Sequence, residues 1–385
     1  MTKLKILFIA GEASGDILGG KLIAALKNQT DAKLELMGIG GTNMEKHGLH
    51  SLFSISELSL MGFTEIVPHI PRLLKRINQT AKFIIDQKPD IVITIDSPDF
   101  CFRVMKKVNQ SEISEKIKKI HFIAPTVWAY RPGRTKKIAK LYDLLLVILP
   151  FEPPYFEKYG LKTVFIGHPI IEKNPDAVPT DFRIKYGISK NEILICLTPG
   201  SRIGEIKRIL PEMTSAINIL SEKYSGITAV ILATDKTYDL IRNHLGEFKT
   251  KVILTTEQDK VSAFNSANLA LAKSGTNTLE ISLHRLPMIV TYKTGFLTYL
   301  IIRILVKVKF ANLINIISNR EIIPEMLQFN CQKNKLAAKL EELILNPDLC
   351  KKQIEESKMA LKMLGIDAKE TPSNKAAKAV LNLIS

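Results

Sequence analysis

Cysteine is scarce in this 385-residue sequence, and the four cysteines stand far apart. They occupy positions 101, 196, 331 and 350, with no paired spacing between them. This scatter argues against a zinc site and against a disulfide framework, and it fits a protein of the reducing cytoplasm. An apolar strand pattern already begins at Leu4, so we expect no signal peptide.

Acidic residues are few relative to basic ones. The chain has 54 lysines and arginines against 38 aspartates and glutamates, which gives a formal net charge of +16 at pH 7. Such an excess attracts anions, among them nucleic acid, anionic lipid and phosphorylated substrates. A lysine-rich solvated surface without a dedicated partner would account for the charge equally well.

Long apolar runs are absent as well. The most apolar stretch, residues 295–317, is interrupted by Arg303, Lys307 and Lys309. A membrane-spanning helix needs about 18 or more consecutive apolar residues, which this stretch does not provide. We expect it to form a buried or surface-lying helix.

Apolar runs of strand length alternate with helical patterns along most of the chain. This alternation predicts an α/β fold with parallel sheets, and 385 residues suffice for two such domains. The polar residues 172–179, with two prolines, are the best linker candidate. We therefore expect a first sheet domain over residues 1–172, a second over residues 185–345, and a helical tail over residues 346–385.

Two loops of the first half follow strand patterns and carry polar groups. Gly11-Glu-Ala-Ser-Gly-Asp16 follows the first strand but lacks the glycine spacing of dinucleotide-binding turns. Asp96-Ser-Pro-Asp99 follows the apolar run of residues 91–95. Ligands of open parallel sheets bind at the carboxyl ends of strands, where a carboxylate is a candidate general base. The same four residues also make a good turn and helix cap, which is the structural alternative.

Two segments of the first half mix basic residues with apolar or aromatic ones. Residues 70–85 carry apolar side chains at helical spacing with lysines and arginines between them. Such a helix packs on a sheet with a solvated basic face, or it contacts an anionic membrane or an acyl chain. Residues 101–145 hold eleven basic and three acidic residues and the only tryptophan, Trp128. That combination suits nucleic acid or the wall of a sugar-phosphate pocket.

Two turns of the second half are suited to an anion. Pro199-Gly-Ser-Arg202 lies between an apolar strand and a helix, so free backbone N–H groups and the Arg202 guanidinium would face a phosphate. Ser274-Gly-Thr276 lies in the same kind of place, with Glu280 about one turn further on. Its N–H groups suit a diphosphate and the Glu280 carboxylate suits a ribose diol. An ordinary helix cap is the alternative.

Nine short motifs, in order along nearly the whole chain, resemble those of lipid-A-disaccharide synthases. Each is weak alone, and the series is specific. The motifs are Gly11-Glu-Ala-Ser-Gly-Asp16, Gly38-Ile-Gly-Gly41 with Met44, Met61-Gly-Phe-Thr-Glu65, Asp96-Ser-Pro-Asp-Phe100, Pro125-Thr-Val-Trp-Ala129, Leu149-Pro-Phe-Glu152, Gly167-His-Pro169, Pro199-Gly-Ser-Arg202 and Ser274-Gly-Thr-Asn-Thr-Leu-Glu280.

The resemblance implies a glycosyltransferase of the GT-B fold. That fold has two Rossmann-like domains, the active site in the cleft between them, and here a helical C-terminal tail. The implied reaction joins UDP-2,3-diacylglucosamine to 2,3-diacylglucosamine 1-phosphate (lipid X) and yields the β-1,6-linked lipid A disaccharide 1-phosphate and UDP. Inversion needs a base for the acceptor hydroxyl and stabilisation of the leaving diphosphate. This fold type normally supplies the latter from protein groups, so we expect neither a metal nor another cofactor.

The resemblance also implies roles for single residues. Asp99 is the candidate base, Asp96 a supporting carboxylate, and Arg202 the group that holds the departing diphosphate. Further UDP contacts are implied at Ser201, Ser274, Gly275, Thr276, Glu280, Asn312 and Gln328, and a cleft loop at Ser14, Gly15 and Asp16. We expect the acceptor or membrane contact at Met61, Ile66, Val67, Ile70, Leu73 and Leu74. The chain departs from the family pattern at Tyr130, where a second tryptophan is more usual.

Anionic, acylated substrates would also account for the positive charge. We therefore expect a cytoplasmic enzyme bound peripherally to the inner membrane, without a nucleic-acid partner. The family's C-terminal segments suggest a homodimer. Two other functions remain open: another UDP-sugar enzyme of this architecture, such as a UDP-N-acetylglucosamine 2-epimerase, and a basic nucleic-acid-binding protein that uses residues 101–145.

Overall fold

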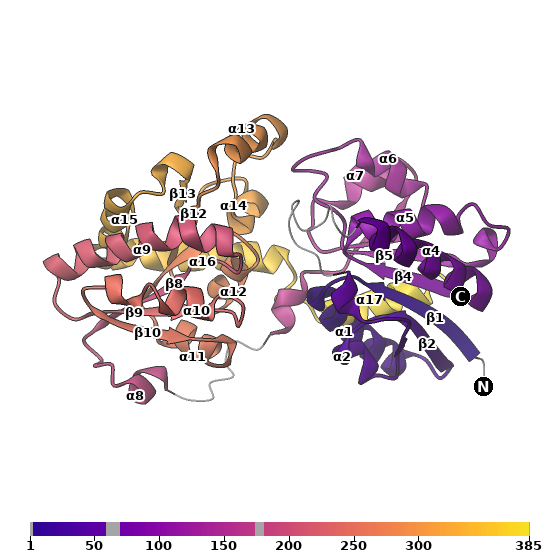
Figure 1. Ribbon diagram of the computed structural model, residues 1–385, viewed down its shortest axis with the longest axis horizontal. Helices are drawn as coiled ribbons and strands as arrows, with labels where there is room; N and C mark the ends of the chain where they lie inside the picture. Colours follow the sequence, from indigo (N-terminus) through magenta and orange to yellow (C-terminus); the bar gives the residue numbers. More distant parts are fainter. Residues whose placement is uncertain (1–2, 59–69, 174–180, 385) are drawn as a thin grey trace. The chain divides into compact units, whose positions relative to one another are not determined.

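The computed structural model describes residues 3–58, 70–173 and 181–384. The chain divides into two compact units (Figure 1). Unit 1 consists of Met1–Glu172 and Asp367–Ser385, and unit 2 of Lys173–Ile366. Each unit is built on one sheet of parallel strands.

The sheet of unit 1 has the order β3-β2-β1-β4-β5-β6-β7. Its central strands are almost wholly apolar because a parallel strand with helices on both sides meets no solvent. The strands are β1 (Lys3–Ala10), β2 (Lys33–Ile39), β3 (His50–Ser51), β4 (Ile91–Ile95), β5 (Lys118–Phe122), β6 (Leu144–Val147) and β7 (Lys162–Phe165).

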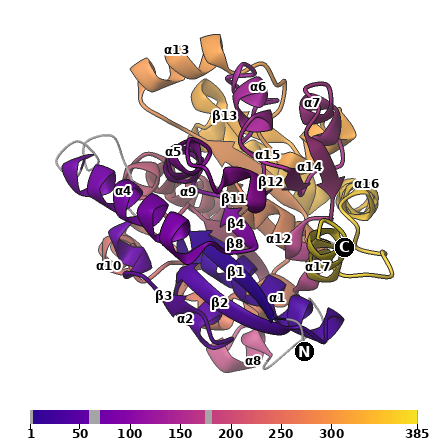
Figure 2. The ribbon, with the colours of Figure 1, turned by 90° about the vertical axis from the view of Figure 1, so that its right-hand side faces the viewer.

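Helices cover both faces of this sheet (Figure 2). Successive side chains of β1 point to opposite faces, so Phe8 packs in the core beneath α1 and α17 while Leu7 packs beneath α4, α5 and α6. The helices are α1 (Ala13–Gln29), α2 (Thr42–Glu45), α4 (Ile70–Gln87), α5 (Pro98–Val108), α6 (Arg134–Ala139), α7 (Pro153–Glu157) and α17 (Pro372–Leu381).

The sheet of unit 2 has the order β10-β9-β8-β11-β12-β13. Its strands are β8 (Ile193–Thr198), β9 (Ile227–Leu232), β10 (Lys251–Thr255), β11 (Leu269–Lys273), β12 (Met288–Tyr292) and β13 (Glu325–Leu327). Its helices are α8 (Phe182–Tyr186), α9 (Ile203–Lys223), α10 (Tyr238–Arg242), α11 (Lys260–Ser266), α12 (Asn277–Leu283), α13 (Phe296–Leu305), α14 (Leu313–Ser318), α15 (Lys333–Leu345) and α16 (Pro347–Met363).

The strand order reverses once in each sheet. In unit 1 the reversal lies between β1 and β4, and in unit 2 between β8 and β11. Connections leave such a pair of strands in opposite directions, which opens a crevice at their carboxyl ends where ligands bind. The motifs that begin at Gly11, Asp96, Pro199 and Ser274 directly follow these four strands.

The predicted α/β fold with two parallel sheets and a helical C-terminal region is confirmed. The C-terminal helices belong to different units: α16 packs on α12 and α14, and α17 packs on α1. The predicted linker at residues 172–179 lies mostly outside the described residues, as do Met61, Ile66 and Val67. Within the described ranges no helix is both long and apolar enough to cross a membrane.

Candidate functional site

The turn after β8 has the geometry of an anion-binding loop. Gly200 adopts a φ of +116°, and a Cβ at this position would lie 2.7 Å from Oε2 of Glu205. The positive φ favours glycine because other residues rarely adopt this conformation, and the short distance leaves no room for a Cβ. Ser201 and Arg202 follow, both exposed, and α9 begins at Ile203. The free N–H groups at the start of this long helix therefore adjoin these two residues in the chain.

The turn after β11 lies next to it, because β8 and β11 are neighbours in the sheet. The Ser274 hydroxyl donates a hydrogen bond to the Ala311 carbonyl (2.8 Å). Gly275 and Thr276 lead into α12. The two turns that the sequence singled out 70 residues apart therefore meet at one edge of the sheet.

A cavity of about 340 Å³ lies between these turns. Ser201, Gly275 and Thr276 line it, as predicted for UDP contacts, whereas Arg202 and Ser274 stand beside it. The remaining walls come from Thr198, Gly200, residues 232–234, Glu257, Lys260, Lys273 and Asn277. This is a polar site at the topological switch point, on a scale that suits part of a nucleotide.

Two lysines that the sequence reasoning missed supply positive charge to this cavity. Lys273 Nζ lies 3.1 Å from Glu205 Oε1, and Lys260 Nζ lies 2.7 Å from Glu280 Oε2. Burial alone would lower the pKa of Lys260, but Glu280 and Glu257 outweigh it and raise the pKa above its usual value. Lys273 is the last residue of the strand before the Ser274 turn, and this position could have identified it as a candidate site residue. No sequence motif marks Lys260.

Glu280 is buried, with both carboxylate oxygens in ion pairs. Oε1 accepts a hydrogen bond from Lys173 (2.8 Å) and Oε2 lies 2.7 Å from Lys260. Burial raises the pKa of Glu280, but the two lysines outweigh it and the net shift is downward. A carboxylate oxygen accepts more than one hydrogen bond, so the predicted contact with a ribose diol does not require either lysine to leave.

Asn312 and Gln328, predicted as nucleotide contacts, form hydrogen bonds with the backbone. The Asn312 side chain is fully buried and accepts the Ile314 N–H at the start of α14 (2.7 Å). Gln328 bonds the backbone of Thr294 twice, through Oε1 (3.1 Å) and Nε2 (3.0 Å). Neither residue lines the cavity between the turns. Sequence position alone does not distinguish an amide that binds a ligand from one that satisfies a loop.

In unit 1, Asp16 organises the turn after β2. Its Oδ1 accepts the N–H groups of Gly41 (2.8 Å) and Met44 (3.1 Å), and its Oδ2 accepts two hydrogen bonds from Asn43. Burial opposes ionisation, but these hydrogen bonds prevail and hold the pKa of Asp16 below its usual value. Asp16 is therefore a structural residue beneath the predicted cleft loop. Of its predicted companions, Gly15 is buried and Ser14 is exposed.

The loop after β4 presents two carboxylates in different surroundings. Asp96 and Ser97 both have a positive φ, of +50° and +45°, which turns the chain sharply into α5. Burial raises the pKa of Asp96, and a hydrogen bond from the Ser97 backbone opposes this only partly. Asp99, by contrast, has 78% of its side chain exposed and forms an ion pair with Arg134 (3.0 Å). Asp96 is half-buried, so Asp99 is the more accessible of the two.

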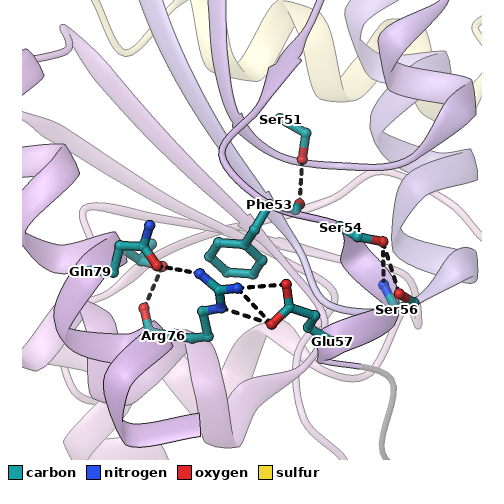
Figure 3. Close-up of polar contacts among 8 residues, drawn as sticks. Ser51, Phe53, Ser54, Ser56, Glu57, Arg76 and Gln79 are labelled. Atoms are coloured by element: carbon teal, nitrogen blue, oxygen red, sulfur yellow. Dashed lines mark hydrogen bonds and ion pairs between the residues drawn. The ribbon is translucent and has the colours of Figure 1, made fainter. Parts of the chain in front are cut away.

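Helix α4 carries the described part of the predicted membrane contact. Its inner face is anchored by Arg76, which binds Glu57 through two nitrogens and lies over the Phe53 ring, 4.4 Å from its centroid (Figure 3). Its outer face leaves Ile70 and Leu74 exposed, at 42% and 46%. Leu73 is half-buried.

Two other motifs meet in unit 1 through a hydrogen bond. Trp128 Nε1 donates to Glu152 Oε1 (3.2 Å), and the Leu149 N–H donates to Glu152 Oε2 (3.0 Å). Burial raises the pKa of Glu152 to about 7 despite these bonds. The tryptophan therefore serves to tie two loops together, which accounts for these motifs structurally.

The described residues contain no group of three or more His, Cys, Asp or Glu side chains placed to hold a metal ion. The charges available at the unit 2 cavity are cationic side chains with acidic partners, namely Arg202, Lys260 and Lys273. Such groups can stabilise a phosphate by charge and hydrogen bonds.

Comparison with protein families gives one match along nearly the whole chain. A sequence model described as lipid-A-disaccharide synthetase matches residues 6–380. The lipid-A-disaccharide synthase of Rickettsia bellii (strain OSU 85-389) is 48% identical over 379 residues, which cover 98% of each chain. The enzyme of the same name from Rhodospirillum centenum is 39% identical over 387 residues, with 100% of this chain and 96% of the relative covered.

Solved structures share the fold at low sequence identity. The S. aureus MnaA structure with UDP has a TM-score of 0.63 at 15% identity and covers 99% of this chain and 96% of its own. UDP-GlcNAc 2-epimerase from Neisseria meningitidis, bound to UDP-GlcNAc, has a TM-score of 0.62 at 13% identity, with 99% of both chains covered. The glycotransferase of kitacinnamycin gives 0.65 at 12% identity, with 99% of both covered. These likenesses confirm the predicted GT-B architecture.

Proposed function

Because the chain belongs to the lipid-A-disaccharide synthase family, we propose that it joins UDP-2,3-diacylglucosamine to 2,3-diacylglucosamine 1-phosphate. The products are the β-1,6-linked disaccharide 1-phosphate and UDP. The structural observation that carries the proposal is the cavity between the turns after β8 and β11, with Lys260, Lys273 and Arg202 in or beside it. These cations and the N–H groups of α9 suit a sugar nucleotide's diphosphate.

In the reaction, the acceptor 6-hydroxyl attacks C1 of the donor sugar from the side opposite the diphosphate. The C1–O bond to the diphosphate breaks, its electron pair leaves with UDP, and the hydroxyl proton passes to a carboxylate. Asp99 is the proposed base because it is the accessible carboxylate at the switch point of unit 1. Arg202 stabilises the charge that develops on the diphosphate, where a fixed cation is most effective.

We propose that this leaving-group stabilisation needs no metal ion. The support is the cationic set of Arg202, Lys260 and Lys273, which can supply the positive charge that a divalent cation would otherwise bring. Turnover should then be the same with and without a chelator such as EDTA. Loss of turnover on chelation, restored by Mg²⁺, would contradict this part of the proposal.

An epimerase of the same fold is the competing function, since structures of that class resemble the chain. At 13% identity that resemblance extends to the fold alone, whereas relatives at 39–48% identity carry the synthase name. Incubating the protein with both diacylated substrates and detecting the disaccharide by mass separates the two. Conversion of UDP-N-acetylglucosamine to its 2-epimer, without disaccharide, would favour the epimerase.

We also propose that the protein binds the anionic inner membrane peripherally from the cytoplasm. Besides Ile70 and Leu74 of α4, unit 2 exposes a larger apolar surface on α13. Four of its side chains are strongly exposed: Phe296 (61%), Ile301 (56%), Ile304 (81%) and Leu305 (47%). Residues 281–320 contain six basic residues and no acidic one. Apolar side chains beside an excess of cations are the combination that binds anionic lipid surfaces.

A homodimer is proposed through exchange of α17. This helix is joined to α16 by residues 364–371 and packs against α1 in unit 1. The helix buries Ala376, Ala377 and Val380 in the core of unit 1, and the Ser373 N–H donates to Glu172 Oε1 (2.7 Å). A second copy of the chain offers the same surface. Light scattering after gel filtration tests this, and a monomer mass at micromolar concentration would contradict it.

A further inference from the structure

A second cavity, separate from the one in unit 2, lies between α5 and α6 in unit 1. Its volume is about 580 Å³. Five basic side chains line it: Arg103, Lys106, Arg134, Lys137 and Lys140. Its floor is apolar and consists of Pro98, Phe102, Ile138 and Leu141. The sequence had marked residues 101–145 as basic, but neither the UDP site nor the membrane contact uses them.

Helical spacing explains how the cavity collects these side chains. On α5, Asp99, Phe102, Arg103 and Lys106 are three, four and seven residues apart and so share one face. On α6, Arg134, Lys137 and Ile138 share a face in the same way. Both helices lie on the same side of the sheet and follow the neighbouring strands β4 and β5. Their cationic faces therefore line one cavity.

The charge balance of the cavity is strongly uneven. Asp99 is the one acidic residue among its lining residues, and Asp99 is already paired with Arg134. Among the described residues, no ion pair joins Lys106, Lys137 or Lys140 to an acidic side chain. Like charges gathered around a partly enclosed volume repel one another, and a multiply charged anion relieves that repulsion.

The side chains that line the cavity indicate which kind of anion it binds. Arginine and lysine together suit a phosphate, which accepts several hydrogen bonds at once. The apolar floor suits carbon atoms attached to that phosphate rather than a free ion. A phosphate monoester carried by an apolar or sugar body satisfies both requirements.

We propose that the cavity between α5 and α6 binds the phosphate of the acceptor glycolipid and so orients that substrate at Asp99. The inference rests on the proposed function for the identity of the acceptor. Because Asp99 lines the same cavity as the cations, a phosphate held by Arg103 and Lys137 brings the attached sugar next to the proposed base. Arg134 contacts Asp99 from within the cavity and links the phosphate site to the carboxylate.

Steady-state kinetics with two acceptors test the proposal. One acceptor is 2,3-diacylglucosamine 1-phosphate, and the other is the same molecule without its phosphate. With the phosphorylated acceptor, Arg103→Ala and Lys137→Ala should each raise the acceptor KM by roughly tenfold or more, since a charged hydrogen bond is lost. The KM for the donor and kcat should change little. With the dephosphorylated acceptor, the wild-type protein should already have a high KM, and the same substitutions should raise it little further.

Lys136→Ala is the matched control. Lys136 lies on the same helix and is exposed, but it does not line the cavity. It removes the same charge from the protein, so it separates a local contact from a general loss of positive charge. Lys137→Arg should retain most of the affinity, because arginine can replace one phosphate contact by another.

Two kinetic outcomes would overturn the proposal. One is an equal rise in KM for both acceptors, and the other is an equal effect of Lys136→Ala and Lys137→Ala.

Binding without turnover separates the phosphate site from the proposed function. In calorimetric titration, Lys137→Ala should weaken the binding of 2,3-diacylglucosamine 1-phosphate, and Lys136→Ala should not. Suppose that Lys137→Ala weakens acceptor binding, Lys136→Ala does not, and the wild-type protein forms no disaccharide. The proposed function would then be wrong, and the proposed phosphate site would still be supported.

Tight binding of random RNA that depends on Lys137, without acceptor binding, would assign the cavity to nucleic acid instead.

Discussion

Single residues at the two switch points have distinct chemical surroundings, and these define their roles. Asp16, Asn312 and Gln328 bind backbone groups of the turn after β2, the start of α14 and Thr294. Asp99 and Arg202 keep most of their side chains exposed, at 78% and 65%. The exposed pair are the residues that can meet substrates, and the other three hold backbone segments in shape.

Asp99→Asn tests the assignment of the base. The amide cannot take the acceptor's proton, so turnover should fall by about 10²–10⁴-fold, while UDP binding stays unchanged. Turnover and UDP affinity should be measured on the same preparation. Asp96→Asn is the companion variant, because Asp96 is the other carboxylate of the loop and burial raises its pKa. Full turnover of the Asp99 variant combined with loss in the Asp96 variant would move the base to Asp96.

Lys273→Met tests whether the cation of the unit 2 cavity binds the diphosphate. Glu205 is buried, and its Oε2 has no hydrogen-bond partner. The substitution also removes the lysine that pairs with its Oε1. Stability should fall by about 1–3 kcal/mol, and UDP affinity by roughly tenfold. Thermal denaturation and calorimetric UDP titration measure the two effects.

The double variant Lys273→Met with Glu205→Gln separates stability from binding. It also removes the charge of Glu205, whose remaining partner in the single variant is Arg202 at 3.6 Å. Most of the stability should therefore return, while UDP affinity should stay low. Recovery of both together would mean that Lys273 acts only by neutralising Glu205.

Glu152 should impose a measurable pH dependence on stability. Its pKa is about 7 in the folded protein against an ordinary value of 4.5, so the folded state holds the proton more tightly than the unfolded chain. The free energy of unfolding therefore falls as the pH rises through this interval, by about 3 kcal/mol from this group.

Glu152→Gln removes this titration. At each pH, the free energy of unfolding of Glu152→Gln is subtracted from that of the wild-type protein. This difference should fall with rising pH between about pH 4.5 and 7. The subtraction cancels the opposite contributions of His121 and His168, whose pKa values burial lowers to about 3 and about 4. A difference that does not vary with pH would show that Glu152 ionises normally.

At the scale of elements, α13 decides between the two alternatives that the sequence left for residues 295–317. A buried or a surface-lying helix was expected, and α13 lies on the surface with no fully buried side chain among those described. Periodicity cannot reveal this, because a helix that is apolar on all sides gives no direction to its buried face.

Ile301→Ser with Ile304→Ser should weaken sedimentation with vesicles that contain anionic phosphatidylglycerol. UDP affinity should not change, since neither residue lines the cavity of unit 2. The matched control is Met359→Ser with Met363→Ser, which changes two exposed apolar residues of α16 (63% and 49%). Equal losses of vesicle binding in the two double variants, or no loss in either, would show that α13 does not form the membrane contact.

The sequence predicted the alternation of strands and helices, and it singled out the two turns that line the unit 2 cavity. Both depend on local signals: continuous apolar runs for buried strands, and glycine beside serine and arginine at their ends. The partners of those turns were not predictable in the same way. Lys260 reaches the cavity from α11, and Lys173 reaches Glu280 across 107 residues, so only the sheet order brings them together.

At the scale of the whole molecule, the two units present complementary chemistry. Unit 2 offers cations and helix N–H groups to a diphosphate, and unit 1 offers an exposed carboxylate beside a cationic cavity. A transferase needs both halves, one for the leaving group and one for the attacking hydroxyl. An epimerase, which acts on one sugar nucleotide, has no need of a phosphate site beside Asp99.

The configuration of the product tests this account most directly. The protein should be incubated with UDP-2,3-diacylglucosamine and 2,3-diacylglucosamine 1-phosphate, and the isolated disaccharide examined by NMR. Attack opposite the α-linked diphosphate predicts a β-anomeric linkage to the 6-position of the acceptor, with one UDP released per disaccharide. An α linkage, bonding at another position, or consumption of the UDP-sugar without any disaccharide would contradict it.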